Sequence, residues 1–350
     1  MQIDKRLFYR INLFTGIVLC CIITSCTGQV NNNDKQKSIE ENIANQVPNV
    51  KEQISQVVRM MFQDSKGDFW FGTQDGAFKL DGDSLIHIDN IKSESGTHVT
   101  IKDITEDKNG IIWLGHSDGI SSINGTLVTN YYKSDGLISN DVWCIEADTN
   151  GIVWIGTIKG ACTFNGHKFT NFDLPEGEKD TTMGVSSAKM VHSIFEDNKG
   201  TIWFCNNAGW FSFSNKKLKY ISTEVGIPTN FVSKIIEDKK GGFWISSSIG
   251  LFHLKGDTLT NITKKHFDEN KGTGSMILDS KGDLWFNCAR SIYKLSGEEL
   301  SEYRIEEGNY GPLTFQIYLD QQNRLWFVGF GGAYRLENNK FVNVTKEGPW

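Results

Sequence analysis

The stretch Ala147–Gly160 reads ADTNGIVWIGTIKG and contains a pattern that returns through most of the chain. An Asp is followed three residues later by Gly and six residues later by Trp. The copies are Asp64/Gly67/Trp70, Asp107/Gly110/Trp113, Asp148/Gly151/Trp154, Asp197/Gly200/Trp203, Asp238/Gly241/Trp244, Asp279/Gly282/Trp285 and, with Asn for Gly, Asp320/Asn323/Trp326. Successive tryptophans lie 43, 41, 49, 41, 41 and 41 residues apart. Such a period indicates a repeat architecture.

Each copy predicts a tight β-hairpin followed by further strands. The Asp side chain can accept hydrogen bonds from turn amides, and the Gly or Asn that follows tolerates a left-handed backbone. The Trp lies in an apolar run, such as Ile152–Ile155, which favours a strand buried on both faces. Six residues beyond each Trp a Gly opens a third strand, with Ser291 as the exception. A turn such as Asn165-Gly166 then leads to a fourth strand.

Four antiparallel strands per unit of about 40–45 residues are typical of a β-propeller blade. We therefore predict an all-β fold, a seven-bladed β-propeller of four-stranded antiparallel blades, over residues 53–350. Every unit supplies its own four strands, so we expect the ring to close by apolar packing between blades seven and one, without a shared sheet. The residues expected at this closing interface are Trp326, Tyr334, Trp70 and Phe78.

The repeats resemble those of the two-component regulator propeller family. Residues 102–115 (KDITEDKNGIIWLG) and 145–157 (IEADTNGIVWIGT) are close to the family pattern. The resemblance covers roughly residues 53–346 and implies the propeller fold. In that family such propellers form the extracytoplasmic sensor of bacterial signalling proteins and precede a β-sandwich, a membrane helix and a histidine kinase. None of these follows in this sequence, so we expect a form without the kinase part.

The first residues predict a lipoprotein signal peptide at 1–25. Lys5, Arg6 and Arg10 precede a mostly apolar run, Ile11–Ile23, which is too short for a comfortable membrane span. The sequence ITSC that ends at Cys26 resembles a lipobox, which implies cleavage before Cys26 and acylation of its thiol. Residues 26–52 then form a polar, flexible tether. We expect the protein in the bacterial cell envelope, lipid-anchored at the outer membrane.

Composition argues against several classes of partner. The formal net charge is −6 and no basic cluster is present, so nucleic acid is not expected. No metal site is expected, because the sequence has no CxxC, HxH or HExxH and the recurring Asp is explained by its turn. No cofactor is implied, and no disulfide is expected among the four cysteines of the propeller.

Candidate binding residues lie on the face formed by the loops between second and third strands and between blades. These loops differ from copy to copy, whereas the hairpins on the other face are nearly uniform. In blades four to six the Gly after the Trp run is replaced by Cys205, Ser246 or Asn287, beside further polar side chains. The candidates are His116, Asp118, Lys159, His192, Asn206, Asn207, Trp210, Ser247, Arg290 and Phe330. The long connection at residues 174–187 is a further candidate.

These features favour a module that binds a small molecule, glycan or peptide, or an envelope protein, on its loop face. Polar loops suit a neutral polar ligand, with Trp210 or Phe330 as a stacking surface. One alternative is an enzyme that resembles the seven-bladed streptogramin lyases, in which His116 and His192 would act. Another is a scaffold in an envelope complex. Catalysis is the less favoured reading, and no residue is assigned a catalytic role.

Overall fold

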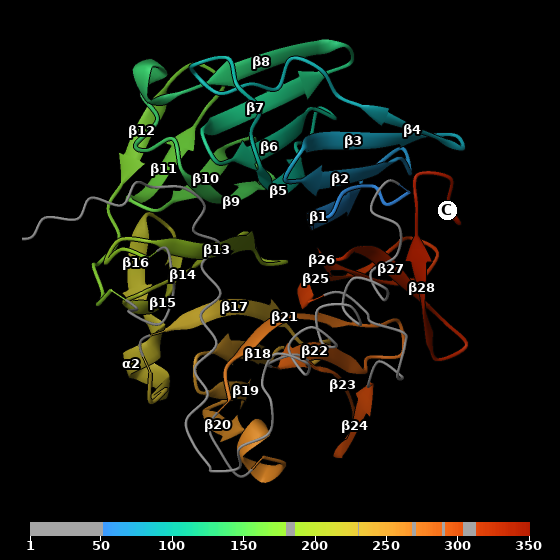
Figure 1. The fold of residues 1–350 in the computed structure, drawn as a ribbon. Helices are drawn as coiled ribbons and strands as arrows, with labels where there is room; N and C mark the ends of the chain where they lie inside the picture. Colours follow the sequence, from blue (N-terminus) through green and yellow to red (C-terminus); the bar gives the residue numbers. More distant parts are fainter. Residues whose placement is uncertain (1–51, 180–185, 230, 268–270, 289–290, 304–312) are drawn as a thin grey trace, which may run out of the picture. The chain divides into compact units, whose positions relative to one another are not determined.

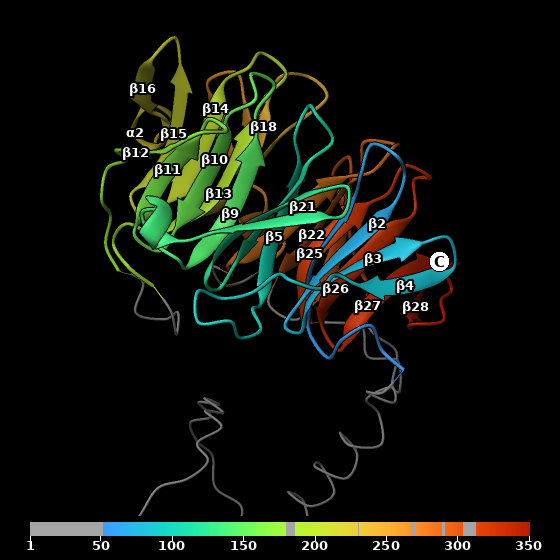
Figure 2. The ribbon, with the colours of Figure 1, turned by 90° about the horizontal axis from the view of Figure 1, so that it is seen from above.

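The computed structural model describes residues 52–350 apart from 180–185, 230, 268–270, 289–290 and 304–312. The expected signal peptide, Cys26 and Arg290 lie outside the described residues. The described part forms seven four-stranded antiparallel sheets arranged in a ring (Figure 1), which confirms the seven-bladed propeller. Seen from above, the sheets stand beside one another as blades (Figure 2).

Each blade contains four consecutive strands, and its first strand lies nearest the axis of the ring (Figure 1). The inner strands are β1 (Val58–Gln63), β5 (Ile101–Glu106), β9 (Val142–Ala147), β13 (Val191–Glu196), β17 (Val232–Glu237), β21 (Thr273–Leu278) and β25 (Leu313–Leu319). The second strands, which carry the recurring Trp, are β2 (Phe69–Thr73), β6 (Ile112–His116), β10 (Val153–Thr157), β14 (Ile202–Asn206), β18 (Phe243–Ser247), β22 (Leu284–Cys288) and β26 (Leu325–Phe330).

The third strands begin at the Gly, or at Ser291, that the repeat pattern identifies. They are β3 (Gly76–Asp81), β7 (Gly119–Asn124), β11 (Gly160–Phe164), β15 (Gly209–Ser214), β19 (Gly250–Lys255), β23 (Ser291–Ser296) and β27 (Gly332–Glu337). The outer strands are β4 (Ser84–His87), β8 (Leu127–Tyr131), β12 (Phe169–Phe172), β16 (Lys217–Tyr220), β20 (Thr258–Asn261), β24 (Glu299–Tyr303) and β28 (Lys340–Val344).

Within the described residues, helical structure is confined to short segments between blades. These are the 3-10 turns η1 (Lys133–Asp135) and η2 (Thr263–Lys265) and the single-turn helix α2 (Ile221–Val225). None of the helices in the described ranges has the length and apolar character needed to cross a membrane.

The recurring Asp has a second partner that the turn interpretation does not include. In blade three, Oδ1 of Asp148 accepts a hydrogen bond from the amide of Ile152 at 2.8 Å, and Oδ2 accepts one from the indole Nε1 of Trp154, also at 2.8 Å. The same indole bond occurs in every blade except the fifth. The Asp is therefore retained six residues before the Trp because it satisfies a ring nitrogen that packing would otherwise bury unpaired.

The tryptophans all face in the same direction around the ring. Trp154 packs against Val191, Ile194 and Phe204 of blade four. By the same rule Trp70 packs against blade two and Trp326 packs against blade one. The core thus consists of interfaces between neighbouring blades and does not form one central mass.

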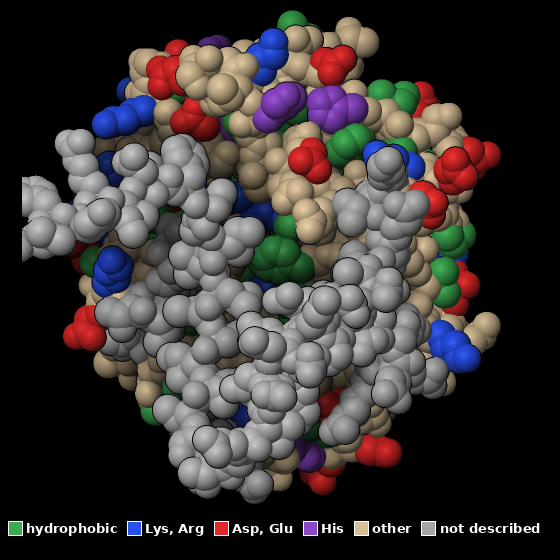
Figure 3. All heavy atoms as spheres, in the orientation of Figure 1, with side chains coloured by type: hydrophobic (Ala, Val, Ile, Leu, Met, Phe, Trp, Pro, Cys, Tyr) green, Lys and Arg blue, Asp and Glu red, His purple; other side chains and the backbone are tan. Residues whose placement is uncertain are grey.

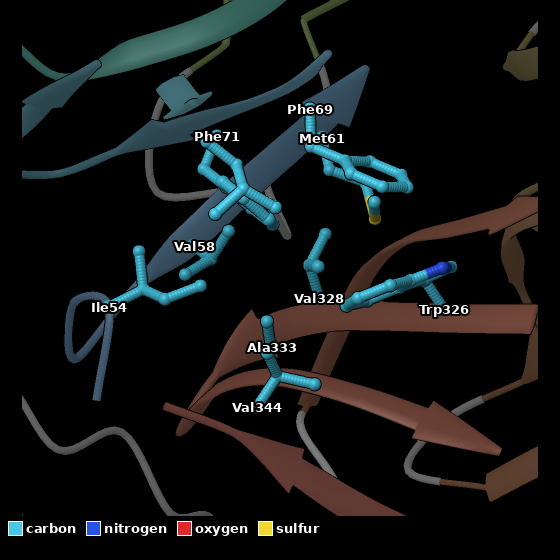
Figure 4. Close-up of a cluster of buried hydrophobic side chains, with 10 residues drawn as sticks. Ile54, Val58, Met61, Phe69, Phe71, Trp326, Val328, Ala333 and Val344 are labelled. Carbon is cyan, nitrogen blue, oxygen red and sulfur yellow. The ribbon is translucent and has the colours of Figure 1, made fainter. Parts of the chain in front are cut away.

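The closing interface confirms two of the four expected residues. Trp326 packs with Phe69 and Phe71 between blades seven and one (Figure 4), and the partly buried Phe78 packs against the same cluster. Trp70 and Tyr334 do not, because side chains alternate between the two faces of a strand. Trp70 therefore faces blade two, and Tyr334, whose register partner is Phe327, packs with Trp285 of blade six.

Backbone contacts also contribute to closure. No strand is shared between blades one and seven in the described part of the chain. However, the segment before β1 pairs with blade seven through the isolated bridges Gln53 to Thr345 and Val57 to Phe330. Ile54 within this segment is only 2% exposed and belongs to the closing cluster. The expectation of purely apolar closure is therefore incomplete.

Candidate functional site

A cavity of about 450 Å³ occupies the axis of the ring. Side chains of all seven inner strands line it. The cavity arises because the inner strands pack around a common axis while their blades diverge outward (Figure 1). Each inner strand begins on the face that carries the loops between second and third strands, as shown by the pairing of Val58 with Thr73. This is the face on which the sequence predicts binding.

Aromatic rings and positive charges meet at the start of the inner strands. Four side chains form this region, which we call the channel mouth: Arg59, Lys102, Trp143 and Phe315. The guanidinium carbon of Arg59 lies 4.7 Å from the ring centre of Phe315 and 6.0 Å from that of Trp143. Nζ of Lys102 lies 3.9 Å from the Trp143 ring centre. Hydrophobic atoms and Lys or Arg atoms are visible together in the hollow at the centre of the ring (Figure 3).

Asp141 neutralises one of the two cations at the mouth. It forms an ion pair with Lys102, and its Oδ2 also accepts a hydrogen bond from Nε1 of Trp143 at 3.2 Å. Burial lowers the pKa of Lys102 and of Arg59, and the nearby carboxylate of Asp141 acts in the opposite direction on both. With one carboxylate for two cations, the channel mouth carries an excess of positive charge.

Ionisable groups also line the cavity deeper along the inner strands. Burial raises the pKa of Asp103 to about 6 and that of Glu146 to about 8, and it lowers the pKa of Lys234. Both carboxyl groups accept amide hydrogen bonds from the next inner strand: Asp103 from Ile145 at 2.9 Å and Glu146 from Glu196 at 3.2 Å. Shifted pKa values in a cavity are typical of functional groups, but these contacts give both carboxyls a role in joining blades.

Asn206 and Asn207 hold the long connection between blades three and four. Nδ2 of Asn206 donates to the carbonyl of Pro175 at 2.9 Å, and Nδ2 of Asn207 donates to the carbonyls of Glu178 at 2.9 Å and Ser187 at 2.7 Å. Both asparagine side chains are buried. The sequence presents these residues and the connection as separate binding candidates, whereas the structure joins them in one internal network.

The replacement of Gly in blades five and six is explained by contacts between blades. A Cβ atom added to Gly115 would lie 2.8 Å from Val142, which opens the next inner strand. In blade five the corresponding Ser246 bonds the hydroxyl of Thr273 at 2.9 Å, and in blade six Asn287 donates to the carbonyl of Thr314 at 3.0 Å. These side chains therefore contact the neighbouring blade.

The other candidates from the sequence differ in position. His116 is completely buried beside Ser121, and burial lowers its pKa to about 3. Trp210 is completely buried between blades four and five, so the interpretation of its ring as a stacking surface is corrected. Ser247 is buried and bonds the carbonyl of Gly250 within its own loop. Asp118 is likewise bonded within the loops, by the amide of Glu94 and the side chain of Asn140.

Three of the candidates predicted from the sequence remain possible binding residues. Two of them have exposed side chains and the third lines the cavity. Lys159 is exposed. Phe330 is 51% exposed and lies 4.9 Å, between ring centres, from Phe315 of the channel mouth. His192 lines the cavity and bonds Asn207.

The candidates predicted from the sequence do not include Arg59, Lys102, Trp143 and Phe315. Three of them, with His192, occupy the second position of their inner strands, where the repeats share no residue type. The variation among the seven copies at that position is the signal that could have identified the channel mouth. No cluster of three or more potential metal-binding side chains occurs within the described ranges.

The sequence profile described as two component regulator propeller matches residues 52–75 and 136–159. Each matched segment includes part of one blade, and together they confirm the resemblance of the repeats to this family. No curated protein matches the chain.

Several solved propellers have a similar fold. The extracellular domain of BT3049, assigned to a hybrid two-component system of B. thetaiotaomicron, is 21% identical with a TM-score of 0.64, over 85% of this chain and 41% of that one. The corresponding domain of BT4673, from the same organism, is 21% identical with a TM-score of 0.64, over 79% of this chain and 38% of that one. Virginiamycin B lyase from Staphylococcus aureus is 19% identical with a TM-score of 0.54, over 72% of this chain and 84% of the lyase. At these identities the likeness establishes the fold alone, and this chain spans less than half the length of the two B. thetaiotaomicron domains.

Proposed function

We propose that this chain, a propeller with two component regulator repeats, is a ligand-binding module of the cell envelope that receives its ligand at the channel mouth. The observation that carries this proposal is the cavity of about 450 Å³ that is lined by Trp143 and Phe315, the two rings that flank Arg59. A concave site that combines aromatic walls with a few polar groups suits a small organic molecule, or the end of a glycan or peptide. In this proposal ligand binding serves extracytoplasmic sensing.

A lyase-like enzyme is less well supported than binding. The two histidines that the enzyme reading uses are not brought together: His192 lines the cavity, whereas His116 is buried in its own blade and is not among the lining residues. With a pKa near 3, His116 stays neutral at physiological pH. Its ring nitrogen is already bonded to Ser121.

The proposal places the propeller outside the cytoplasm, anchored by a lipid on Cys26. The ITSC sequence and the apolar run before it support this anchoring. The similar domains from B. thetaiotaomicron are extracellular, which agrees with a position in the envelope. We assign the anchor to the outer membrane.

Gentle extraction of the native protein tests the binding site. Wild type and Trp143→Ala are purified from membranes in mild detergent, and native mass spectrometry then identifies what each retains. We expect a small molecule, glycan or peptide that wild type keeps and Trp143→Ala loses. Leu127→Ala is the control, because Leu127 is 65% exposed on an outer strand. Equal retention by Trp143→Ala, with an unchanged urea midpoint, would exclude the channel mouth, and retention of a stable protein partner would favour the scaffold alternative.

A further inference from the structure

The described part of the chain contains three arginines, and each lies over an aromatic ring. The guanidinium of Arg324 lies 5.7 Å from the ring centre of Phe69 and 5.5 Å from that of Trp326. Arg335 lies 5.5 Å from the ring centre of Trp326. Arg59, between Phe315 and Trp143, is closer to its nearest ring than either. Stacking of this kind fixes the plane of a guanidinium and reduces the entropy that it loses on binding.

Two of these three arginines also have a carboxylate partner within the molecule. Nε of Arg324 donates to Oδ2 of Asp320 at 2.6 Å, and Nε of Arg335 donates to Oε1 of Glu337 at 2.7 Å. For Arg59, the part of the chain that the structure describes supplies the rings but neither a hydrogen bond nor an ion pair. Its five N–H donors are therefore oriented by the fold beside Trp143 and Phe315, two rings that line the cavity.

The neighbouring carboxylates are committed elsewhere. Asp141 is paired with Lys102 and bonded by Trp143. Deeper in the cavity, Asp103 accepts two backbone amides, those of Ile104 and Ile145, both at 2.9 Å. A carboxylate held by fixed amides is not free to move to Arg59.

We propose that Arg59 is the receptor for the carboxylate of an organic ligand whose apolar part lies against Phe315 and Phe330. This inference rests on the proposed function and names the chemical class of its ligand. A guanidinium binds a carboxylate through two parallel hydrogen bonds, a geometry that a neutral amide cannot reproduce. Phe330 is exposed next to Phe315 and continues the apolar surface outward from the mouth. The ligand is therefore anionic and partly apolar, in contrast to the neutral polar ligand that the loops suggest.

A matched pair of probes tests the charge requirement. Benzoate and benzamide have nearly the same size and ring but differ in charge. Their binding to the propeller is measured by isothermal titration calorimetry and by the fluorescence of the intrinsic tryptophans. We expect benzoate to bind at least about tenfold more tightly than benzamide, because a hydrogen bond to a charged group is worth about 1.5–3 kcal/mol. Acetate, which lacks the ring, should bind more weakly than benzoate.

Variants assign the preference to Arg59. Arg59→Gln should abolish the difference between benzoate and benzamide, and Arg59→Lys should retain part of it, because lysine keeps the charge but not the planar pair of donors. Lys133→Gln removes an exposed positive charge from η1, in the connection between blades two and three, and should bind both probes as wild type does. Urea midpoints show whether each variant remains folded.

The outcomes separate this inference from the proposed function. Equal affinity for the two probes, no binding of either, or a benzoate preference that survives in Arg59→Gln would overturn the role of Arg59. If both probes bind equally and Trp143→Ala abolishes their binding, the channel mouth remains a binding site and only the anionic class is wrong. An Arg59-dependent benzoate preference supports the inference, whatever the extraction experiment recovers.

Discussion

Nε2 of His253 donates a hydrogen bond to Oδ2 of Asp238 at 2.8 Å, in the position where the other six blades use a tryptophan indole. Trp244 of the same blade instead stacks on His253, with ring centres 3.9 Å apart. Burial by itself would raise the pKa of Asp238, but the hydrogen bonds from His253 and from two turn amides together lower it. Blade five thus satisfies the same carboxylate with a different donor.

The shared carboxylate leads to a first prediction. Asp148→Ala removes the acceptor for both the Ile152 amide and the Trp154 indole, so the free energy of unfolding should fall by about 2–4 kcal/mol. Asp81→Ala, in an exposed hairpin turn, should change it by less than about 0.5 kcal/mol. Urea unfolding followed by tryptophan fluorescence measures both. Similar losses for the two variants would show that the bond to the indole contributes little.

Ring closure gives a second prediction. Ile54→Ala should lower the melting temperature by about 5 °C or more, because a buried Ile→Ala change costs about 2–5 kcal/mol. Deletion of residues 27–48 should leave the melting temperature nearly unchanged. Scanning calorimetry of soluble forms distinguishes the two. A large drop after the deletion would mean that the tether takes part in closing the ring.

The interior carboxyl groups predict a pH dependence. Because Glu146 titrates at about 8 in the folded chain and near 4.5 when unfolded, the folded state binds the extra proton between these values, and stability from this source falls as pH rises. Glu146→Gln should therefore gain about 1–3 kcal/mol relative to wild type between about pH 5 and pH 8. Urea unfolding at several pH values measures the gain, and Glu299→Gln, on an exposed outer strand, is the control. A difference that does not vary with pH would contradict the raised pKa of Glu146.

Anchoring gives a fourth prediction. Cys26→Ala should release the protein from membranes or block its processing, because the variant lacks the thiol that receives the lipid. Detergent phase partitioning and metabolic labelling with a fatty acid measure the change. Cys162→Ala, which alters a buried cysteine of the propeller, should leave membrane association unaltered. Mature Cys26→Ala protein that stays in the detergent phase would refute acylation at this position.

The fold could be predicted from the sequence because all seven copies of the repeat indicate the same local structure. Turn residues, strand lengths and the Trp period recur, so an ambiguity in one blade is settled by the others. The pattern does not say which side of a strand faces which neighbour. For that reason the prediction for Trp70 and Tyr334 is wrong: the alternation of side chains along a strand identifies the neighbouring blade only when the direction around the ring is known.

The site was harder to predict because binding residues and packing residues vary among the loops of the seven copies in the same way. Ser246 and Asn287 vary in the same way as binding residues would, yet they join neighbouring blades. Arg59 and Phe315 are more than 250 residues apart in sequence and meet only because the ring closes. No local motif marks such a pair.

The closure of the ring also determines the order in which the blades can pack during synthesis and folding. The amide of Met61 bonds Oε1 of Gln316 at 2.8 Å, a contact between residues 255 positions apart. A ribosome makes blade one long before blade seven, so the surface around Phe71 has no partner through most of synthesis. Contacts of such long range also slow folding. This aromatic surface is therefore exposed to association with other chains until blade seven has been synthesised and has packed against it.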